Sequence, residues 1–108
     1  MDDTDLTFIK KCVLNGRMLW TYHSGMRLQG RAIARETIIR YIDSAEIIVS
    51  YDDDTPLPSC LCLLHGDGNM PIHVVIAVDK PGNNIRFVTV YKPDATQWSE
   101  DFRERRRK

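Results

Sequence analysis

Four short apolar runs, separated by turn signals, fill the second half of this 108-residue chain and constrain its fold most strongly. The runs are residues 46–51, 59–65, 72–79 and 85–91. Two of the connections, GDGN at 66–69 and PGNN at 81–84, have the composition of turns. Because strands joined by such short turns lie antiparallel, the runs predict an antiparallel sheet of about four strands.

The first half of the chain shows helical spacing instead. Apolar residues at positions 6, 9, 13 and 14 predict a helix over residues 5–14, and Asn15 and Gly16 suit its end. We expect two further helices, at 18–31 and 35–43, although the run MLWTYH at 18–23 also fits the start of a strand. The predicted fold class is α+β, a single domain over 1–108 with N-terminal helices packed on a C-terminal antiparallel sheet.

Composition places the chain among ordinary globular proteins, with 43% hydrophobic and 28% charged residues. No apolar run approaches the roughly 20 residues that span a bilayer. The start, MDDTD, has neither a basic segment nor an apolar one, so it does not resemble a secretory signal. Three cysteines argue against a disulfide framework. These features together favour a cytoplasmic protein with reduced thiols.

Formal net charge is zero, but the charges are unevenly placed. Asp52, Asp53 and Asp54 form an acidic cluster, and residues 103–108, RERRRK, form a basic tail. Such a tail can hold phosphates or an acidic partner surface, or can simply be a solvated terminus. The tail alone does not decide between these alternatives.

A row of polar side chains marks the second predicted helix, because His23, Arg27 and Arg31 follow one another at intervals of four residues. Side chains at this spacing are neighbours on one helix surface, about 6 Å apart at Cβ. The row lies beside the apolar face of the helix and not within it. It is either part of a functional cleft or an ordinary exposed polar face.

Three motifs, taken together, give the chain a family resemblance. They are H-x-x-x-R-x-x-x-R-x-I at 23–33, IHVVIAVD at 72–79, and VTVYKPD at 88–94 followed by W-x-x-D-F-x-x-R-R at 98–106. Their order and spacing resemble a small bacterial domain family of unknown function that is similar to RelE/BrnT-like toxins. Members of that family often occur beside a YgiT-type zinc-finger antitoxin. The resemblance implies a compact α+β fold, metal-independent RNA cleavage and a cognate antitoxin as partner.

RNA cleavage without a metal needs a base for the 2′-hydroxyl, an acid for the leaving oxygen, and cations for the phosphorane. Under the resemblance, His23 acts as base or acid, and Arg27 and Arg31 bind the phosphate. No cofactor is implied. The competing hypothesis is a non-catalytic module that grips nucleic acid or an acidic protein with the same residues.

The predicted sheet adds a second candidate set. In 72–79 the apolar side chains alternate, which leaves His73 as the polar residue on the face shared with Val75 and Ala77. His73 is either a hydrogen-bonded structural histidine, which we favour, or an acid or base facing the helix row.

In the last predicted strand, strict alternation places Phe87, Thr89 and Tyr91 on one face. Thr89 and Tyr91 could hydrogen-bond a phosphate or orient a histidine, and Tyr91 could stack on a base. The alternative, which we slightly favour, is cross-strand packing with satisfied hydroxyl groups. Arg86 either reaches the same cleft or is solvated. Trp98, Asp101 and Phe102 are expected to pack the C-terminal segment back on the body.

A metal site is the weakest alternative. Cys60 and Cys62 share a strand face, and His65 and His73 flank the next turn. However, C-x-C among leucines is more typical of buried apolar thiols than of a zinc site, so we predict no metal.

Overall fold

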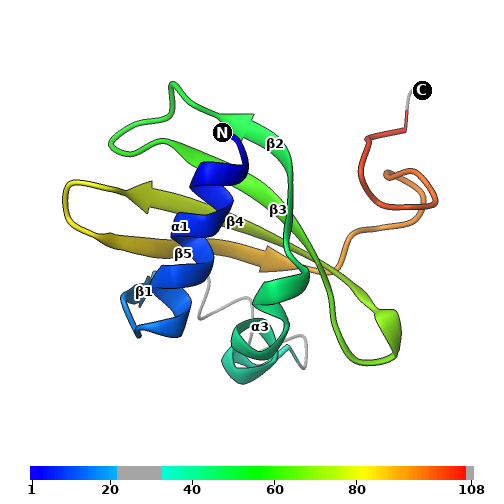
Figure 1. The fold of residues 1–108 in the computed structure, drawn as a ribbon. Helices are drawn as coiled ribbons and strands as arrows, with labels where there is room; N and C mark the ends of the chain where they lie inside the picture. The colour runs from blue at the N-terminus through cyan, green and yellow to red at the C-terminus, as the bar shows by residue number, and fades with distance from the viewer. Residues whose placement is uncertain (22–32, 107–108) are drawn as a thin grey trace.

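The computed structural model describes residues 1–21 and 33–106, and it has the predicted α+β architecture (Figure 1). Its elements are helix α1 (Asp3–Leu14), strand β1 (Met18–Trp20), helix α3 (Arg35–Tyr41), the 3-10 turn η1 (Ile42–Ser44), strand β2 (Glu46–Tyr51), strand β3 (Ser59–His65), the 3-10 turn η2 (Asp67–Asn69), strand β4 (Pro71–Asp79) and strand β5 (Asn84–Tyr91). No helix within these described ranges is both long and apolar enough to cross a membrane.

Strands β2 to β5 form the predicted antiparallel meander, and a fifth strand, β1, extends it. The strand order is β1-β5-β4-β3-β2, with β1 parallel to β5. The predicted helix at 18–31 is therefore wrong at its start, where the strand alternative for MLWTYH is confirmed for residues 18–20. The remainder of that predicted helix, from residue 22 onward, lies outside the described residues.

Pairing with β5 explains why β1 is extended. Backbone hydrogen bonds join Ile85 N to Arg17 O at 3.1 Å and Thr21 N to Phe87 O at 3.2 Å. The indole of Trp20 stacks on Phe87 with ring centroids 4.2 Å apart. These contacts outweigh local preference, which is weak for a three-residue segment.

The two faces of the sheet have different coverings. One face, which we call the helix face, packs against α1 and α3, with α1 lying across it in Figure 1. Its strand residues in the core are Cys60, Cys62, Leu64, Ile72, Val74, Ile76, Val78, Ile85, Phe87 and Val90. The predicted alternation of β4 is confirmed, since its even-numbered residues from 72 to 78 all belong to this core.

The opposite side, which we call the far face, is shaped by a bulge in β5. Val75 pairs with Thr89 but the next residue, Ile76, pairs with Phe87, so Val88 has no partner on β4. One extra residue reverses the direction of the side chains that follow. The prediction that Phe87 shares a face with Thr89 and Tyr91 is therefore wrong.

The reversal decides which residues reach the far face. Phe87 is fully buried in the core of the helix face. Arg86, which pairs with Ala77, lies instead on the same face as Thr89, Tyr91 and His73. Three predicted site residues of β5 thus share one surface with His73.

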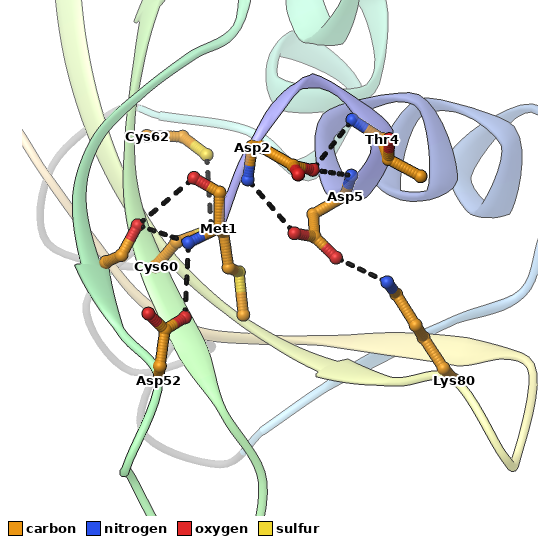
Figure 2. A network of polar contacts seen from close by, with 9 residues as sticks. Met1, Asp2, Thr4, Asp5, Asp52, Cys60, Cys62 and Lys80 are labelled. Carbon is orange, nitrogen blue, oxygen red and sulfur yellow. Dashed lines mark hydrogen bonds and ion pairs between the residues drawn. The ribbon is translucent and has the colours of Figure 1, made fainter.

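The N-terminus is anchored over the edge of the helix face (Figure 2). The ammonium group of Met1 donates to Ser50 Oγ at 2.8 Å and to Asp52 Oδ1 at 3.1 Å. Asp2 and Asp5 form a capping box that satisfies the first backbone N–H groups of α1, with Asp2 Oδ1 accepting from Asp5 N at 3.3 Å. The cap fixes where α1 begins, which in turn places its buried side chains on the sheet.

Two residues of α1 test how much this packing stabilises the fold. Ile9 is 0% exposed, whereas Leu14 at the end of the same helix is 84% exposed. We expect Ile9→Ala to lower the free energy of unfolding by about 2–5 kcal/mol, because it leaves a cavity under the helix. Leu14→Ala is the matched control and should change it by less than about 0.5 kcal/mol. Urea denaturation followed by circular dichroism measures both, and equal effects would contradict the assigned packing.

Candidate functional site

His23, Arg27 and Arg31 of the polar row lie outside the described residues, so their sharing a cleft with the β-strand residues stays a prediction. The last described residue before this segment is Thr21. Thr21 hydrogen-bonds β5 through its backbone N–H, and its Oγ1 donates to Val88 O at 3.2 Å. The chain thus enters the segment from the bulge of β5.

His73 is fully buried, and both of its ring nitrogens have protein partners. Nε2 lies 2.9 Å from the carbonyl oxygen of Phe102, and Nδ1 lies 3.2 Å from the hydroxyl of Tyr91. A carbonyl oxygen can only accept, so Nε2 carries the proton and Nδ1 accepts from the Tyr91 O–H. This is the geometry of the hydrogen-bonded structural histidine.

Burial also keeps the pair neutral. Desolvation lowers the pKa of His73, and the nearby positive charge of Arg105 lowers it further, against the hydrogen bond to Phe102, which raises it. Burial raises the pKa of Tyr91. A neutral histidine and a neutral phenol therefore hold each other in one orientation near neutral pH.

The same pair anchors the C-terminal segment, as the sequence predicts for Trp98. The indole of Trp98 is 3% exposed and meets the His73 ring edge-on, with centroids 4.4 Å apart and an interplanar angle of 89°. Phe102 contributes its backbone carbonyl rather than its ring to this contact. Asp101 is exposed and instead closes a local turn by accepting from Ser99 Oγ at 2.6 Å.

The arginines of the basic tail that lie within the described range all have partners, Arg103 on strand β2 and Arg105 and Arg106 within the C-terminal segment. Arg103 forms two hydrogen bonds to the carboxylate of Glu46, at 2.8 and 3.1 Å. The guanidinium of Arg105 lies 4.8 Å from the Trp98 ring centroid, and Arg106 Nε donates to Ala95 O at 2.9 Å. Residues 103–106 are therefore part of the packed C-terminal segment.

Arg86 has a different environment from these arginines. Its Nε–H is buried, yet it has no hydrogen-bond acceptor among the described residues. The side chain lines a cavity of about 210 Å³ on the far face. A buried donor without a partner costs about 1–3 kcal/mol, so a ligand that brought an acceptor to this atom would relieve the cost.

The walls of this cavity, which we call the Arg86 cavity, come from three parts of the chain. They are Thr21, residues 54–57 with Ser59, Val75 and Ala77 of β4, and Arg86 and Val88 of β5. Asp54 supplies the one carboxylate among these wall residues. Its oxygens accept from Ser59 Oγ at 2.8 Å and from Thr55 N at 3.2 Å, which hold the carboxylate in place.

A second, wider hollow of about 590 Å³ adjoins the Arg86 cavity, because the two share Asp54, Ser59 and Val75. Asp52 and Asp53 also line it. The acidic cluster, which the sequence placed only in a loop, thus faces the same side of the sheet as the candidate site residues. The run of three aspartates at 52–54 is the sequence signal for this part of the candidate site.

Distance along the sheet separates the predicted site residues into two groups. The four residue steps from His73 to Ala77 span about 13 Å of strand. The His73–Tyr91 pair and Arg86 therefore lie at opposite ends of the far face, with Thr89 between them. One phosphate cannot touch both groups, but an extended ligand could cross from one to the other.

The cysteine and histidine side chains of the metal alternative lie on opposite sides of the sheet. Cys60 and Cys62 are buried on the helix face, with their Sγ atoms 3.7 Å apart (Figure 2). His73 projects from the far face, where it contacts Tyr91. The sheet separates these groups, so they cannot surround one ion.

The burial of His73 predicts a pH dependence of stability. Its pKa is near 6.5 in the unfolded chain and lower in the folded protein, so the unfolded chain binds the proton first as pH falls. The contribution of neutral His73 to the free energy of unfolding is complete above about pH 6.5. It is lost as pH falls from there through the folded-state pKa, by at most about 1.4 kcal/mol per pH unit.

Urea denaturation of the wild type and of His73→Gln, between pH 7.5 and 5, measures this effect. We expect the variant to show a shallower loss of stability over that range. A wild-type stability that does not change below pH 6.5 would contradict a neutral, buried His73.

Comparison with known proteins identifies one family. Residues 20–92 match the family described as a domain of unknown function, DUF4258. That range contains β2 to β5, the walls of the Arg86 cavity and the His73–Tyr91 pair, whereas α1 and Trp98 lie outside it. No curated protein and no solved structure matches the chain. Because the match covers more than half of its residues, the chain belongs to the DUF4258 family.

Proposed function

We propose that this protein is a toxin-type endoribonuclease that cleaves RNA without a metal, and that the RNA lies across the far face. The observation that supports the proposal most is the buried Nε–H of Arg86, which has no acceptor among the described residues and lines a cavity together with Thr21, next to the segment with the His23–Arg31 row. An arginine donor without a protein acceptor suits an acceptor-rich ligand, and RNA is such a ligand.

The roles in this proposal follow from chemistry. His23 transfers the proton, while Arg27 and Arg31 balance the charge that develops on the phosphorane. Arg86 and Thr89 bind the RNA on the sheet. Tyr91 offers its ring and its phenol oxygen to the RNA, and His73 positions Tyr91, because both nitrogens of His73 are already bonded.

The proposed partners are RNA and a cognate zinc-finger antitoxin, and the proposed location is the cytoplasm. The antitoxin rests on the family resemblance to RelE/BrnT-like toxins. In the toxin proposal, the antitoxin blocks access of RNA to the far face.

A non-catalytic binding module is the second candidate, and one observation favours it. His73, the candidate histidine on the described part of the far face, is fully engaged by Phe102 and Tyr91. Proton transfer then depends on His23 alone among the candidate histidines. Replacement of His23 therefore distinguishes the ribonuclease from the non-catalytic binding module.

The experiment incubates the purified full chain with end-labelled single-stranded RNA in excess EDTA and follows cleavage on a denaturing gel. We expect cleavage, and we expect His23→Ala to slow it by about 10²- to 10⁴-fold, the usual contribution of a general acid or base. His65→Ala is the matched control and should retain the wild-type rate.

Other outcomes assign the function differently. Salt-sensitive RNA binding with no cleavage by the wild type would establish the binding module instead. Cleavage at the same rate by wild type and His23→Ala would remove His23 from the chemistry. Neither cleavage nor binding at low salt would overturn both functions.

A further inference from the structure

The Arg86 cavity has the size and polarity of a site for one nucleobase. We propose that it binds a guanine base of the RNA, an inference that rests on the proposed function and specifies its substrate. Arg86 and Asp54, a guanidinium and a carboxylate, line the same small hollow together with Thr21. The proposal depends on this pairing of a donor group with an acceptor group.

The volume of the cavity limits the ligand to a small group. At about 210 Å³ it is smaller than the roughly 300–1,000 Å³ that drug-sized ligands occupy. Much of the wall is apolar, with Pro56, Leu57, Val75, Ala77 and Val88. Enzymes that extract a base from RNA or DNA hold it between apolar or aromatic side chains and read its edge with hydrogen bonds.

Charge decides between a base and a phosphate. A phosphate at Arg86 would also meet the carboxylate of Asp54, with Asp53 in the adjoining hollow. Like charges close together in a partly buried site repel one another. A neutral base avoids this repulsion and uses both Arg86 and Asp54.

Guanine fits the donor and acceptor pattern better than the other bases. Its O6 and N7 are adjacent acceptors, which an arginine binds with two parallel N–H groups, here Nε–H and one Nη–H of Arg86. Its N1–H and N2–H are adjacent donors that suit the two oxygens of a carboxylate. Adenine and cytosine each offer a single amino group, and uracil a single ring N–H, so none of them can give a carboxylate two adjacent donors.

Asp54 is prepared for this role by its existing contacts. Each carboxylate oxygen already accepts one hydrogen bond, from Ser59 Oγ or from Thr55 N. A carboxylate oxygen can accept two, so one position on each oxygen remains for a ligand. The existing bonds orient the group without occupying it fully, which lowers the entropic cost of binding.

The test measures the affinity of the full chain, with His23→Ala to prevent cleavage, for fluorescent hexauridylates that carry one central G, A, C or inosine. We expect the G-containing RNA to bind about tenfold or more tightly than the RNAs with A or C, since a two-point contact discriminates by about that factor. Inosine, which lacks the 2-amino group, should bind with intermediate affinity. Fluorescence anisotropy gives each dissociation constant.

Matched variants then assign the preference to the cavity. Arg86→Met and Asp54→Asn should reduce the preference for G to less than about threefold. Arg17→Met and Asp53→Asn remove the same charges outside the Arg86 cavity and should preserve it. The base series is measured on the unaltered cavity, so it decides the question even if a cavity variant fails to fold.

The outcomes separate this inference from the function on which it rests. Equal affinity for all four bases, with RNA still bound or cleaved, overturns the guanine site and leaves the ribonuclease proposal intact. If no RNA binds, the proposed function fails, and a titration with guanosine monophosphate tests the cavity alone. Saturable binding that Arg86→Met abolishes would retain the guanine site, and no binding would overturn it.

Discussion

At Val88, strand β5 carries one residue more than its partner β4, and this bulge determines what each face of the sheet presents. With regular alternation, Arg86 and Phe87 would exchange sides. The guanidinium would then enter a core made of isoleucine, valine and cysteine, while a phenylalanine would face solvent. Burying an unpaired charge costs far more than the irregular backbone, so the bulge is the arrangement that lets both side chains fit.

On the far face that results, one end has a structural role and the other end holds a candidate site. At one end the C-terminal segment covers the sheet through Trp98 and the Phe102 carbonyl, and it uses His73 as a hydrogen-bonded anchor. At the other end Arg86 and Asp54 line a cavity. Among the described residues, the two ends differ in how completely their polar groups are satisfied, since His73 has partners for both nitrogens and Arg86 Nε has none.

The features that sequence analysis predicted correctly are local in the chain. The four strands of the meander follow from apolar runs and turn residues within a few positions of one another, and α1 follows from its spacing. Strand β1 was assigned to a helix because its pairing partner is more than 60 residues away. The Val88 bulge has no local signal, since it reflects the match between two strands.

The same distinction between local signals and long-range contacts explains which residues of the candidate site the sequence predicts. Arg86, Thr89 and Tyr91 were named from their residue types, and the structure places them on one face with His73. The role of His73 could not be decided from sequence, because its partners are 18 and 29 residues further along. Asp54 was missed because a carboxylate in an acidic loop gains meaning only when the fold sets it beside an arginine in a cavity.

In the proposed function, electrostatics favour recognition of bases over bulk attraction to the RNA backbone. The chain has no formal net charge, Arg103 pairs with Glu46, and Arg105 and Arg106 contact the C-terminal segment. Asp53 and Asp54 line the hollow beside the Arg86 cavity and oppose any phosphate that approaches it, whereas Asp52 pairs with the ammonium group of Met1. Non-specific binders hold RNA by a broad cationic surface. In the proposal, affinity comes instead from a few contacts to base edges together with the cations at residues 27 and 31, and such binding is selective for sequence.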